Sequence, residues 1–427
     1  MRRVGSCFVR PETARTARDV VDGLLAGLPR ANCWTLAEHA GHRSPDRIQY
    51  LLGRAVWDDA AVRSELAEYV AANLTDGVDP DRVVLVFDET GDQKKGSHTV
   101  GVQRQYSGTC GRIENCQVAV FATLASPRGH AFIDVGLYLP QSWTTDPGRL
   151  AEAGVPEDVE FQTKPQLALA MTDRALAAGI LPGWVSADEA YGDNPRLRQA
   201  FEERHLNYVM AVSCDTQIPT PADTSTGTGT GRMRADEFAA QLPATDWHLA
   251  SAGKGSKGER LYHWALTRLA NLSRAGYRWL LVRRHPATGE QAYFLCHATT
   301  DVSLARLATV AGTRWRIEEN IQVGKGCAAL DEHQVRTWTS WHRWTTLAML
   351  AHAFLAVQAG PDSHPDPSRA MVPLTCNEIR HLRATITHPS HPLTHTIRWS
   401  RFRRHHQHHA RLCHYRRRNQ DYELRLY

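Results

Sequence analysis

The N-terminal part of the chain repeats apolar residues at intervals of three and four, which is the pattern of helices that bury one face. Turn and capping residues separate the segments. The pattern predicts four helices, over Thr13–Leu28, Trp34–Ala40, Arg47–Leu52 and Asp58–Leu74. We therefore expect a small helical domain over residues 1–78. Short helices joined by tight turns are compatible with DNA binding, but a plain helical bundle has the same pattern.

After Asp81 the helical spacing gives way to short apolar runs. Val83–Phe87 is continuously apolar and rich in β-branched residues, as in a strand buried on both faces, and we expect it to end at Asp88. Strand-like and helical segments then alternate, which indicates an α/β fold. The expected elements are strands at Cys116–Thr123 and Ala131–Leu139, a helix at Pro165–Ala178, a strand at Gly183–Ala187 that ends at Asp188, a helix at Pro195–Glu203 and a strand at Asn207–Val212.

Between about residues 213 and 300 the pattern is that of a β-rich insertion. A Thr/Gly/Pro stretch at Pro219–Gly231 predicts a mobile loop, and alternating apolar and polar residues predict strands near Tyr262–Leu269, Tyr277–Arg283 and Gln291–His297. Helical patterns return at Leu304–Val310, Thr313–Lys325 and Trp341–Val357. The core domain is thus expected over residues 79–357, followed over residues 358–427 by a linker and a basic helical tail.

Charge is distributed unevenly along the chain. The 427 residues are 42% hydrophobic and 22% charged, which is enough to bury a large core, and the net charge is +5. The segment Arg398–Arg418 holds eight arginines, five histidines and no acid, which favours an anionic partner, with nucleic acid the expected large one. Metal binding by His405, His406, His408 and His409 is the weaker interpretation, because the neighbouring arginines repel a cation.

No segment indicates export or membrane insertion. The N-terminus lacks the apolar run of a signal peptide, and the longest apolar stretch, Trp344–Val357, is too short to span a bilayer. The nine cysteines contain no C-x-x-C pair and no zinc-finger spacing. We expect a cytoplasmic protein without a disulfide framework or a structural zinc site.

Three acids form the candidate chemical site: Asp88, Asp188 and Glu318. Ligands of open α/β sheets bind where loops diverge at the carboxyl ends of strands, and both aspartates follow expected strands. Carboxylate oxygens suit Mg²⁺, and two such ions can activate an attacking oxygen and stabilise a leaving one at phosphorus. Each aspartate alone is better explained as a strand-end cap. Their order, with the glutamate on a late helix after an insertion, resembles that of the ribonuclease H-like nucleotidyl transferase fold.

The late helix carries a charged face. Arg314, Glu318 and Lys325 are spaced by four and seven residues, so they project from one side of a helix. A solvated surface helix can carry such a row as well. Glu319 is the rival for the third acid, but the residue four positions before it is Trp315, so it lies off the cationic face.

Three sequence blocks resemble the insertion-sequence 701 family of DDE transposases. Phe87–Thr109, which reads FDETGDQKKGSHTVGVQRQYSGT, resembles the block of the first aspartate, and Leu137–Trp143 and Ala187–Asp193 resemble the next two. The larger cut-and-paste group has a Y-R-E-K signature, which Arg314, Glu318 and Lys325 match in spacing. Ala311 stands at the tyrosine position. This departure removes one expected phosphate contact and leaves open whether cleavage follows the group's hairpin route.

The resemblance implies a site and a reaction. Asp88, Asp188 and Glu318 would hold two Mg²⁺ ions, or Mn²⁺ in their place, and Arg314 and Lys325 would bind phosphates of the element's ends. Further phosphate contacts at Lys94 and Lys95 are an expectation from their place next to Asp88, although a solvated loop fits equally well. The partners would be double-stranded DNA, as element ends and as target, and a second copy of the chain in a homodimer on paired ends.

The main hypothesis is therefore a transposase that binds terminal inverted repeats, cleaves DNA and transfers the strand, in a bacterial cytoplasm at the nucleoid. The alternatives are a ribonuclease H-like nuclease without strand transfer and a DNA-binding regulator derived from a transposase. We expect no nucleotide cofactor, because the loop Gly253–Gly258 only superficially resembles a phosphate loop and Glu259 stands where that motif requires lysine. This loop is better explained as a surface hairpin.

Overall fold

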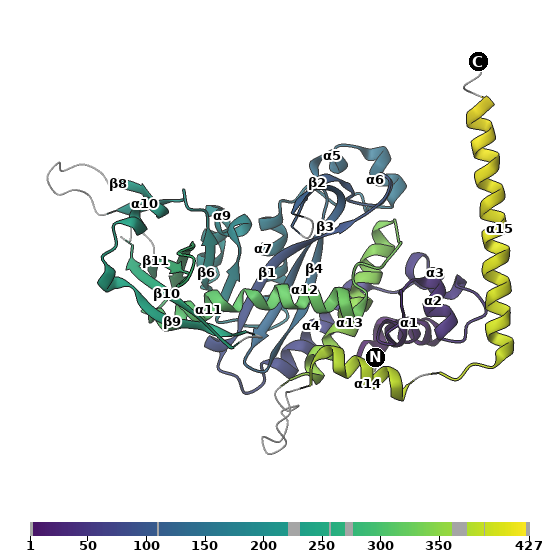
Figure 1. Ribbon diagram of the computed structural model, residues 1–427, viewed down its shortest axis with the longest axis horizontal. Helices are drawn as coiled ribbons and strands as arrows, with labels where there is room; N and C mark the ends of the chain where they lie inside the picture. The colour runs from purple at the N-terminus through teal and green to yellow at the C-terminus, as the bar shows by residue number, and fades with distance from the viewer. Residues whose placement is uncertain are drawn as a thin grey trace.

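The computed structural model describes residues 3–108, 111–220, 231–255, 258–269, 276–360, 374–387 and 389–423 (Figure 1). A large mixed β-sheet runs through its centre. The N-terminal and C-terminal parts of the chain are helical and lie beside this sheet. The predicted loop at Pro219–Gly231 and the predicted linker after residue 358 lie mostly outside the described residues. The α/β class expected from the sequence is confirmed.

The N-terminal helices lie close to their predicted positions. Asn32 caps one of them by accepting hydrogen bonds from Trp34 N and Thr35 N, and Asp58 caps another. The elements are a short 3₁₀ helix at Arg3–Cys7, α1 (Pro11–Leu24), α2 (Cys33–His39), α3 (Asp46–Gly53), α4 (Asp59–Leu74) and a second 3₁₀ turn at Pro80–Arg82. Their buried side chains belong to the same hydrophobic core as the central sheet. The domain boundary near residue 78 therefore stays a prediction.

Five strands form the first part of the sheet, in the order β4-β3-β1-β5-β6. β1 is antiparallel to β3 and parallel to β5, which is in turn parallel to β6. The bounds are β1 (Val84–Gln93), β2 (Gln103–Ser107), β3 (Arg112–Ser126), β4 (Gly129–Tyr138), α5 (Gln141–Thr144), α6 (Pro147–Ala153), α7 (Lys164–Ala177), β5 (Trp184–Ala187), α8 (Glu189–Gly192), α9 (Pro195–Glu203) and β6 (Asn207–Val212).

The expected end of the first strand at Asp88 is wrong. β1 continues to Gln93, because β3 is long enough to pair with every residue from Val84 to Gln93. Only the parallel partner stops early: β5 ends at Ala187, opposite Phe87. Beyond Phe87, β1 no longer pairs with β5 along that edge. The residues of β1 after Phe87 are also less buried.

The insertion extends the same sheet. β12 (Gln291–Ala298) pairs antiparallel with β6, and β11 (Tyr277–Arg284), β10 (Gly258–Arg268) and β9 (His248–Gly255) follow outward, so the described sheet has ten strands. A smaller hydrophobic cluster covers its outer face, with β7 (Gln217–Thr220), β8 (Gly231–Arg234), α10 (Ala235–Ala240) and a 3₁₀ turn at Ala244–Asp246. The loop before Glu259 lies at a β-hairpin between β9 and β10, as predicted, with its tip outside the described residues.

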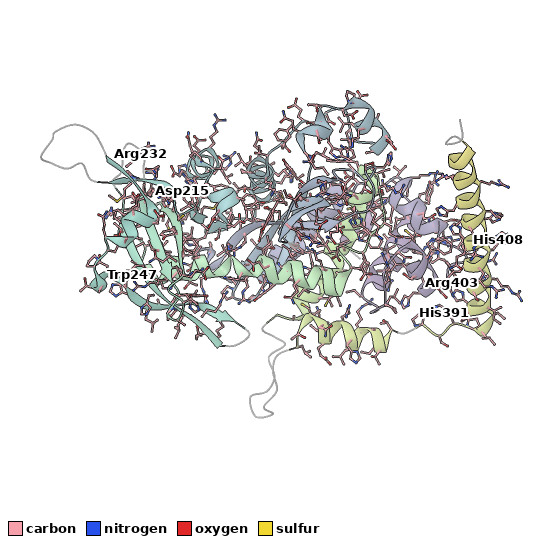
Figure 2. The ribbon with its side chains drawn as sticks, turned by 45° about the horizontal axis from the view of Figure 1, so that its top comes forward. Asp215, Arg232, Trp247, His391, Arg403 and His408 are labelled. Atoms are coloured by element: carbon pink, nitrogen blue, oxygen red, sulfur yellow. The ribbon has the colours of Figure 1, made fainter. Side chains whose placement is uncertain are left out.

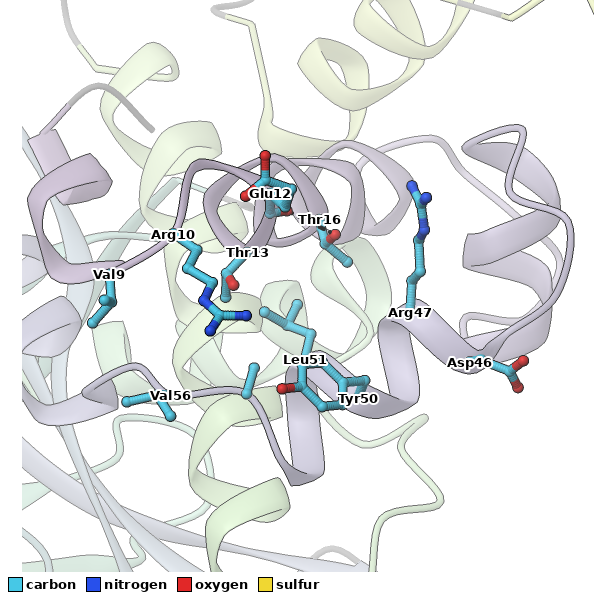
Figure 3. A pocket seen from close by; sticks show the side chains of 11 residues that line it. Val9, Arg10, Glu12, Thr13, Thr16, Asp46, Arg47, Tyr50, Leu51 and Val56 are labelled. Atoms are coloured by element: carbon cyan, nitrogen blue, oxygen red, sulfur yellow. Dashed lines mark hydrogen bonds between the residues drawn. The ribbon is translucent and has the colours of Figure 1, made fainter.

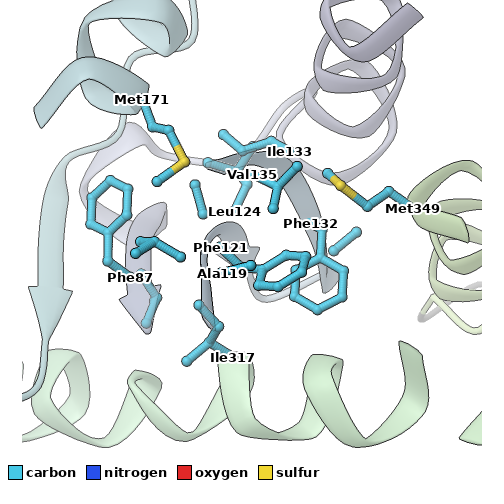
Figure 4. Packing of buried hydrophobic residues seen from close by; sticks show 14 of the residues in the cluster. Phe87, Ala119, Phe121, Leu124, Phe132, Ile133, Val135, Met171, Ile317 and Met349 are labelled. Atoms are coloured by element: carbon cyan, nitrogen blue, oxygen red, sulfur yellow. The ribbon is translucent and has the colours of Figure 1, made fainter. Parts of the chain in front are cut away.

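Three late helices pack on the sheet. These are α11 (Leu304–Thr313), α12 (Trp315–Ala328) and α13 (Trp338–Gln358). Ile317 of α12 lies beneath Phe87, Phe121 and Phe132 of the sheet (Figure 4). Burial of these large apolar side chains holds α12 in a defined position along β1. The core thus places the charged face of α12 next to the strands that carry the aspartates.

The C-terminal tail folds back to the N-terminal helices. α14 (Cys376–Ile386) was not predicted, and α15 (Leu393–Glu423) rises past α2 at the far side of the molecule from the insertion (Figure 1). Trp399 of α15 is fully buried, and its Nε1 donates to His42 O at 3.0 Å. Arg403 forms an ion pair with Glu38 of α2. Figure 2 labels His391, Arg403 and His408 along this segment.

Candidate active site and phosphate-binding residues

The strand register brings the two aspartates together. Phe87 pairs with Ala187 across the parallel strands, so Asp88 and Asp188 follow at the same level on strands that lie about 4.8 Å apart. Asp188 also caps α8 by accepting from Ala190 N at 3.0 Å. Gly192 permits this close packing, since a Cβ there would lie 1.7 Å from Ala211 O on β6.

Both aspartates are partly buried, in an environment that disfavours their charge. Burial, and then the nearby Asp188 carboxylate, raise the pKa of Asp88 to about 7, although Arg314 opposes the rise. Burial, and then Glu89, raise the pKa of Asp188 to about 6. Loss of hydration penalises the ionised form of an acid, and a neighbouring negative charge adds to the penalty. The site therefore has more buried negative charge than its own cations neutralise.

Arg314 connects the third acid to this pair. Its Nη2 donates to Glu318 Oε1 at 2.7 Å, and its Nη1 lies 3.7 Å from Asp88 Oδ2. Arg314 stands at the junction of α11 and α12, where both helices are nearly continuous. Gly312 lets this junction approach the insertion, because a Cβ there would lie 1.9 Å from Ala252 O of β9. The predicted pairing of Arg314 and Glu318 on one helical face is thus present beside Asp88.

The rival acid, Glu319, is occupied elsewhere. It forms ion pairs with Arg316 at 2.7 Å and with His130 at 3.2 Å. Burial favours its neutral form, but hydrogen bonds from His130 and then Arg316 outweigh burial and lower the pKa of Glu319 to about 2. Next to it, Asn320 contacts His130 and Thr123, so this side of α12 anchors the helix to the sheet.

The predicted phosphate-binding lysines differ in position. Lys325 Nζ donates to Gly91 O of β1 at 3.3 Å, so it lies along β1 from the aspartates. Lys94 is paired with Asp92 and donates to His333 O at 3.2 Å, and its side chain is only 11% exposed. Lys95 is exposed. The structure groups Arg314 with the acids and places the side chain of Lys94 in a separate buried ion pair.

Sequence reasoning missed a fourth carboxylate in the site, Glu89. Glu89 forms an ion pair with Lys164 at 2.5 Å and accepts from the hydroxyl of Tyr191 at 2.8 Å. Lys164 begins α7 and Tyr191 lies in α8, so three distant segments meet here. The available signal was adjacency alone: Glu89 follows Asp88, and Tyr191 comes shortly after Asp188.

The donor set fits a hard divalent cation. In the described part of the chain, no three His, Cys, Asp or Glu side chains are gathered as a ready metal cluster, and the guanidinium of Arg314 lies between Asp88 and Glu318. The donors near it are nevertheless all carboxylate oxygens, which are the ligands that Mg²⁺ prefers. The raised pKa values of Asp88 and Asp188 show that a cation at the aspartates would relieve unfavourable charge.

A cavity of about 560 Å³ lies away from the acids, between the start of α1 and α3 (Figure 3). Arg10, Arg47 and the exposed Tyr50 lie on its rim. On α15, the four histidines His405, His406, His408 and His409 are exposed among arginines. Among the described residues, no helix is both long and apolar enough to cross a membrane.

Comparison with known proteins identifies the family. Residues 3–266 match the sequence model of the family described as "DDE superfamily endonuclease", which is more than half of the chain and includes both aspartates. The chain belongs to this DDE endonuclease family. The match ends before Glu318, so the third acid rests on the geometry described above.

One curated relative of this DDE endonuclease is the "Probable transposase for insertion sequence element IS701" of Microchaete diplosiphon. The two are 28% identical over 192 residues, which is 44% of this chain and 46% of the relative. The match thus spans about half of the relative's length. The resemblance to insertion-sequence 701 transposases noted in the sequence is confirmed by this comparison.

Proposed function

We propose that this DDE endonuclease is a transposase with a ribonuclease H-like catalytic core. The strand order β4-β3-β1-β5-β6, with an antiparallel meander followed by two parallel strands, supports the proposed core. The enzyme would bind terminal inverted repeats, cleave the DNA at the element ends and join the freed 3′ hydroxyl to target DNA. The substrate is double-stranded DNA in the bacterial cytoplasm, at the nucleoid.

One observation carries this proposal: the register of Phe87 with Ala187 places Asp88 beside Asp188, and Arg314 links this pair to Glu318. A buried carboxylate pair together with an arginine is suited to phosphoryl transfer, because the acids hold metal while the arginine binds phosphate. Residues that only capped strands would not need an arginine that joins a strand-end aspartate to a helical glutamate.

The residues divide the work as follows. Asp88, Asp188 and Glu318 would hold two Mg²⁺ ions, or Mn²⁺ in their place, and the bound ions would lower the pKa of the attacking water and stabilise charge at phosphorus. Arg314 and Lys325 would bind phosphates of the element end, with Lys95 as a further contact. Lys94 would join them only if its ion pair with Asp92 opened. Glu89, held by Lys164 and Tyr191, would keep the negative potential that attracts cations to the site.

The DNA ends would be recognised by the N-terminal helices together with α15. Trp399 and Arg403 dock α15 on α2, while the described side chains between Arg404 and Arg417 are mostly exposed and include arginines and histidines but no acid (Figure 2). Neutralised phosphates release counterions, so such a basic helix contributes affinity that does not depend on sequence. Two copies of the chain would assemble as a homodimer on paired ends.

The experiment combines purified full-length protein, Mg²⁺ and labelled DNA that carries the element's inverted repeats. Wild type should cleave the ends and join them to target DNA, and Asp88→Ala should do neither. Asp173→Ala is the matched control, because Asp173 is a surface aspartate paired with Arg204. Cleavage by Asp88→Ala would refute the site. Cleavage without joining would identify a nuclease, and sequence-specific binding without cleavage would identify a regulator derived from a transposase.

A further inference from the structure

The insertion sheet presents a cationic surface next to the acid site. Arg260, Tyr262 and Trp264 alternate along β10 and therefore share one face, and Trp264 pairs with Arg283 of β11, which places Arg283 on the same face. Deeper on this face, Trp279, Leu281 and Phe294 are buried in the main core beneath α11. Towards the start of α12, this face of the insertion sheet therefore carries Arg260, Arg283 and Tyr262 in place of apolar core residues.

Arg283 lacks an acidic partner. Its Cζ lies 4.7 Å from the ring centroid of Tyr262, yet no carboxylate lies within ion-pair distance of it in the described part of the chain. By contrast, Arg278 on the same strand forms an ion pair with Glu202 at 2.6 Å. A partly buried guanidinium whose close contact is an aromatic face, with no ion pair, retains hydrogen-bond donors for a ligand.

The neighbouring cations make this position unfavourable without an anion. Burial lowers the pKa of Arg283; Tyr262 and, more weakly, Glu290 oppose this fall, and Arg314 adds to it. Burial also lowers the pKa of Arg260, and Arg316 is the next cause. Arg260 donates to the carbonyls of Ala252 and Gly312 at 3.2 and 3.0 Å, so its contacts join the insertion to the α11–α12 junction without supplying negative charge.

We propose that Arg283, held against Tyr262, binds a phosphate of the DNA strand that runs from the acid site across the insertion. This assignment rests on the proposed function, because Arg314 at the acids supplies the neighbouring phosphate contact. Guanidinium groups bind phosphate through two parallel N–H donors, and no described carboxylate is within ion-pair distance of Arg283. Two arginines on different elements, Arg314 and Arg283, would then hold phosphates on either side of the scissile position.

The test measures DNA binding rather than turnover. In full-length protein with Asp88→Asn, which prevents cleavage, the affinity for a duplex that carries the element end is measured across a salt series. Arg283→Gln should weaken binding roughly tenfold and reduce the salt-dependence slope by about 0.9, as expected for one lost phosphate contact. Arg283→Lys should retain the slope, because it keeps the charge.

Arg284→Gln is the matched control. Arg284 is the next residue of β11, so its side chain projects to the opposite face, where its Cζ lies 3.9 Å from the ring of Trp247. Trp247 belongs to the cluster on the outer face of the insertion (Figure 2). This variant removes the same charge from the same strand, and it should bind like the Asp88→Asn parent.

The outcomes separate the two proposals. An unchanged slope for Arg283→Gln, or an equal loss for Arg284→Gln, would overturn the phosphate site even if wild type cleaves element ends. A reduced slope for Arg283→Gln alone supports the site, and a wild type that nevertheless fails to cleave with Mg²⁺ would refute only the transposase. If Arg283→Gln unfolds, Arg283→Lys together with Tyr262→Phe decides: both should retain the slope, and loss by the charge-retaining lysine variant would show a structural role.

Discussion

The partly buried aspartate pair should make the protein less stable at neutral pH than at mildly acidic pH when no divalent cation is present. The folded-state pKa of Asp88 is about 7, whereas its ordinary value is 3.8. Between these values the folded state binds more protons than the unfolded state, so the free energy of unfolding falls as pH rises from about 4 to about 7. Asp88→Asn replaces the ionisable group with a neutral one of similar shape, and it should remove this loss.

The magnitude follows from the difference between the two pKa values. About three pKa units correspond to about 4 kcal/mol, and sharing of charge with Asp188 reduces the expected gain to about 2–4 kcal/mol at pH 8. At pH 4 the variant and wild type should differ by less than about 1 kcal/mol, because Asp88 is mostly protonated in folded wild type and asparagine carries no charge. Urea unfolding in a chelating buffer at the two pH values measures the difference.

Asp92→Asn provides a control of opposite sign on the same strand. Burial favours neutral Asp92, but hydrogen bonds and charge from His333 and Lys94 outweigh burial and lower its pKa. Its ionised form therefore stabilises the fold at pH 8, and the asparagine variant should be less stable there. If Asp88→Asn is no more stable than wild type at pH 8, the charge-strain argument is refuted, and with it the reason to place a cation at this pair.

Three further changes test other parts of the structure. Glu318→Gln should reduce DNA cleavage by about 10³-fold or more without loss of stability. Glu319→Gln should keep cleavage but lower the free energy of unfolding in urea by about 1–3 kcal/mol. The reverse pattern would exchange the roles of the two acids. Trp399→Ala should weaken the docking of α15 by about 3–5 kcal/mol and expose it to protease, and unchanged digestion would contradict the docking. Lys164→Met removes a cation that lowers the pKa of Asp188, so the acid limb of the cleavage rate should move to higher pH; an unmoved limb would exclude this coupling.

Local pattern was sufficient where an element depends on its own residues. The predicted strand at Asn207–Val212 and the predicted helix at Pro195–Glu203 coincide with β6 and α9, because an apolar run and an Asn194 cap with proline determine them locally. The end of β1 was missed because it depends on how far β3 pairs, which is information from a distant segment. Asp88 and Asp188 nevertheless lie at one level, because the parallel partner of β1 stops at Ala187, opposite Phe87.

Side chains that act through tertiary contacts escaped sequence reasoning. Lys164 contacts Glu89 across 75 positions, and no periodicity connects a helix start with a strand interior. The docking of α15 was missed for a related reason. Trp399 is fully buried on a helix that is otherwise polar and basic, so the apolar pattern of the helix is too sparse to predict a partner. Arg398–Arg418 was therefore predicted as a basic tail, and its attachment to α2 through Arg403 was not.

The arrangement of charge explains why metal and DNA should bind together. Asp88 lies near Asp188 and Glu89, and Arg314 connects Asp88 to Glu318. The cations paired with these acids are Arg314 and Lys164. Without metal the excess of carboxylates repels a phosphate backbone, and Arg314 remains on Glu318. Divalent charge at the aspartates would reverse the sign of the local potential and weaken the hold on Arg314, which frees its donors for phosphate. On this argument the affinity of the acid site for DNA rises when metal binds, whereas the basic surface of α15 attracts DNA with or without it.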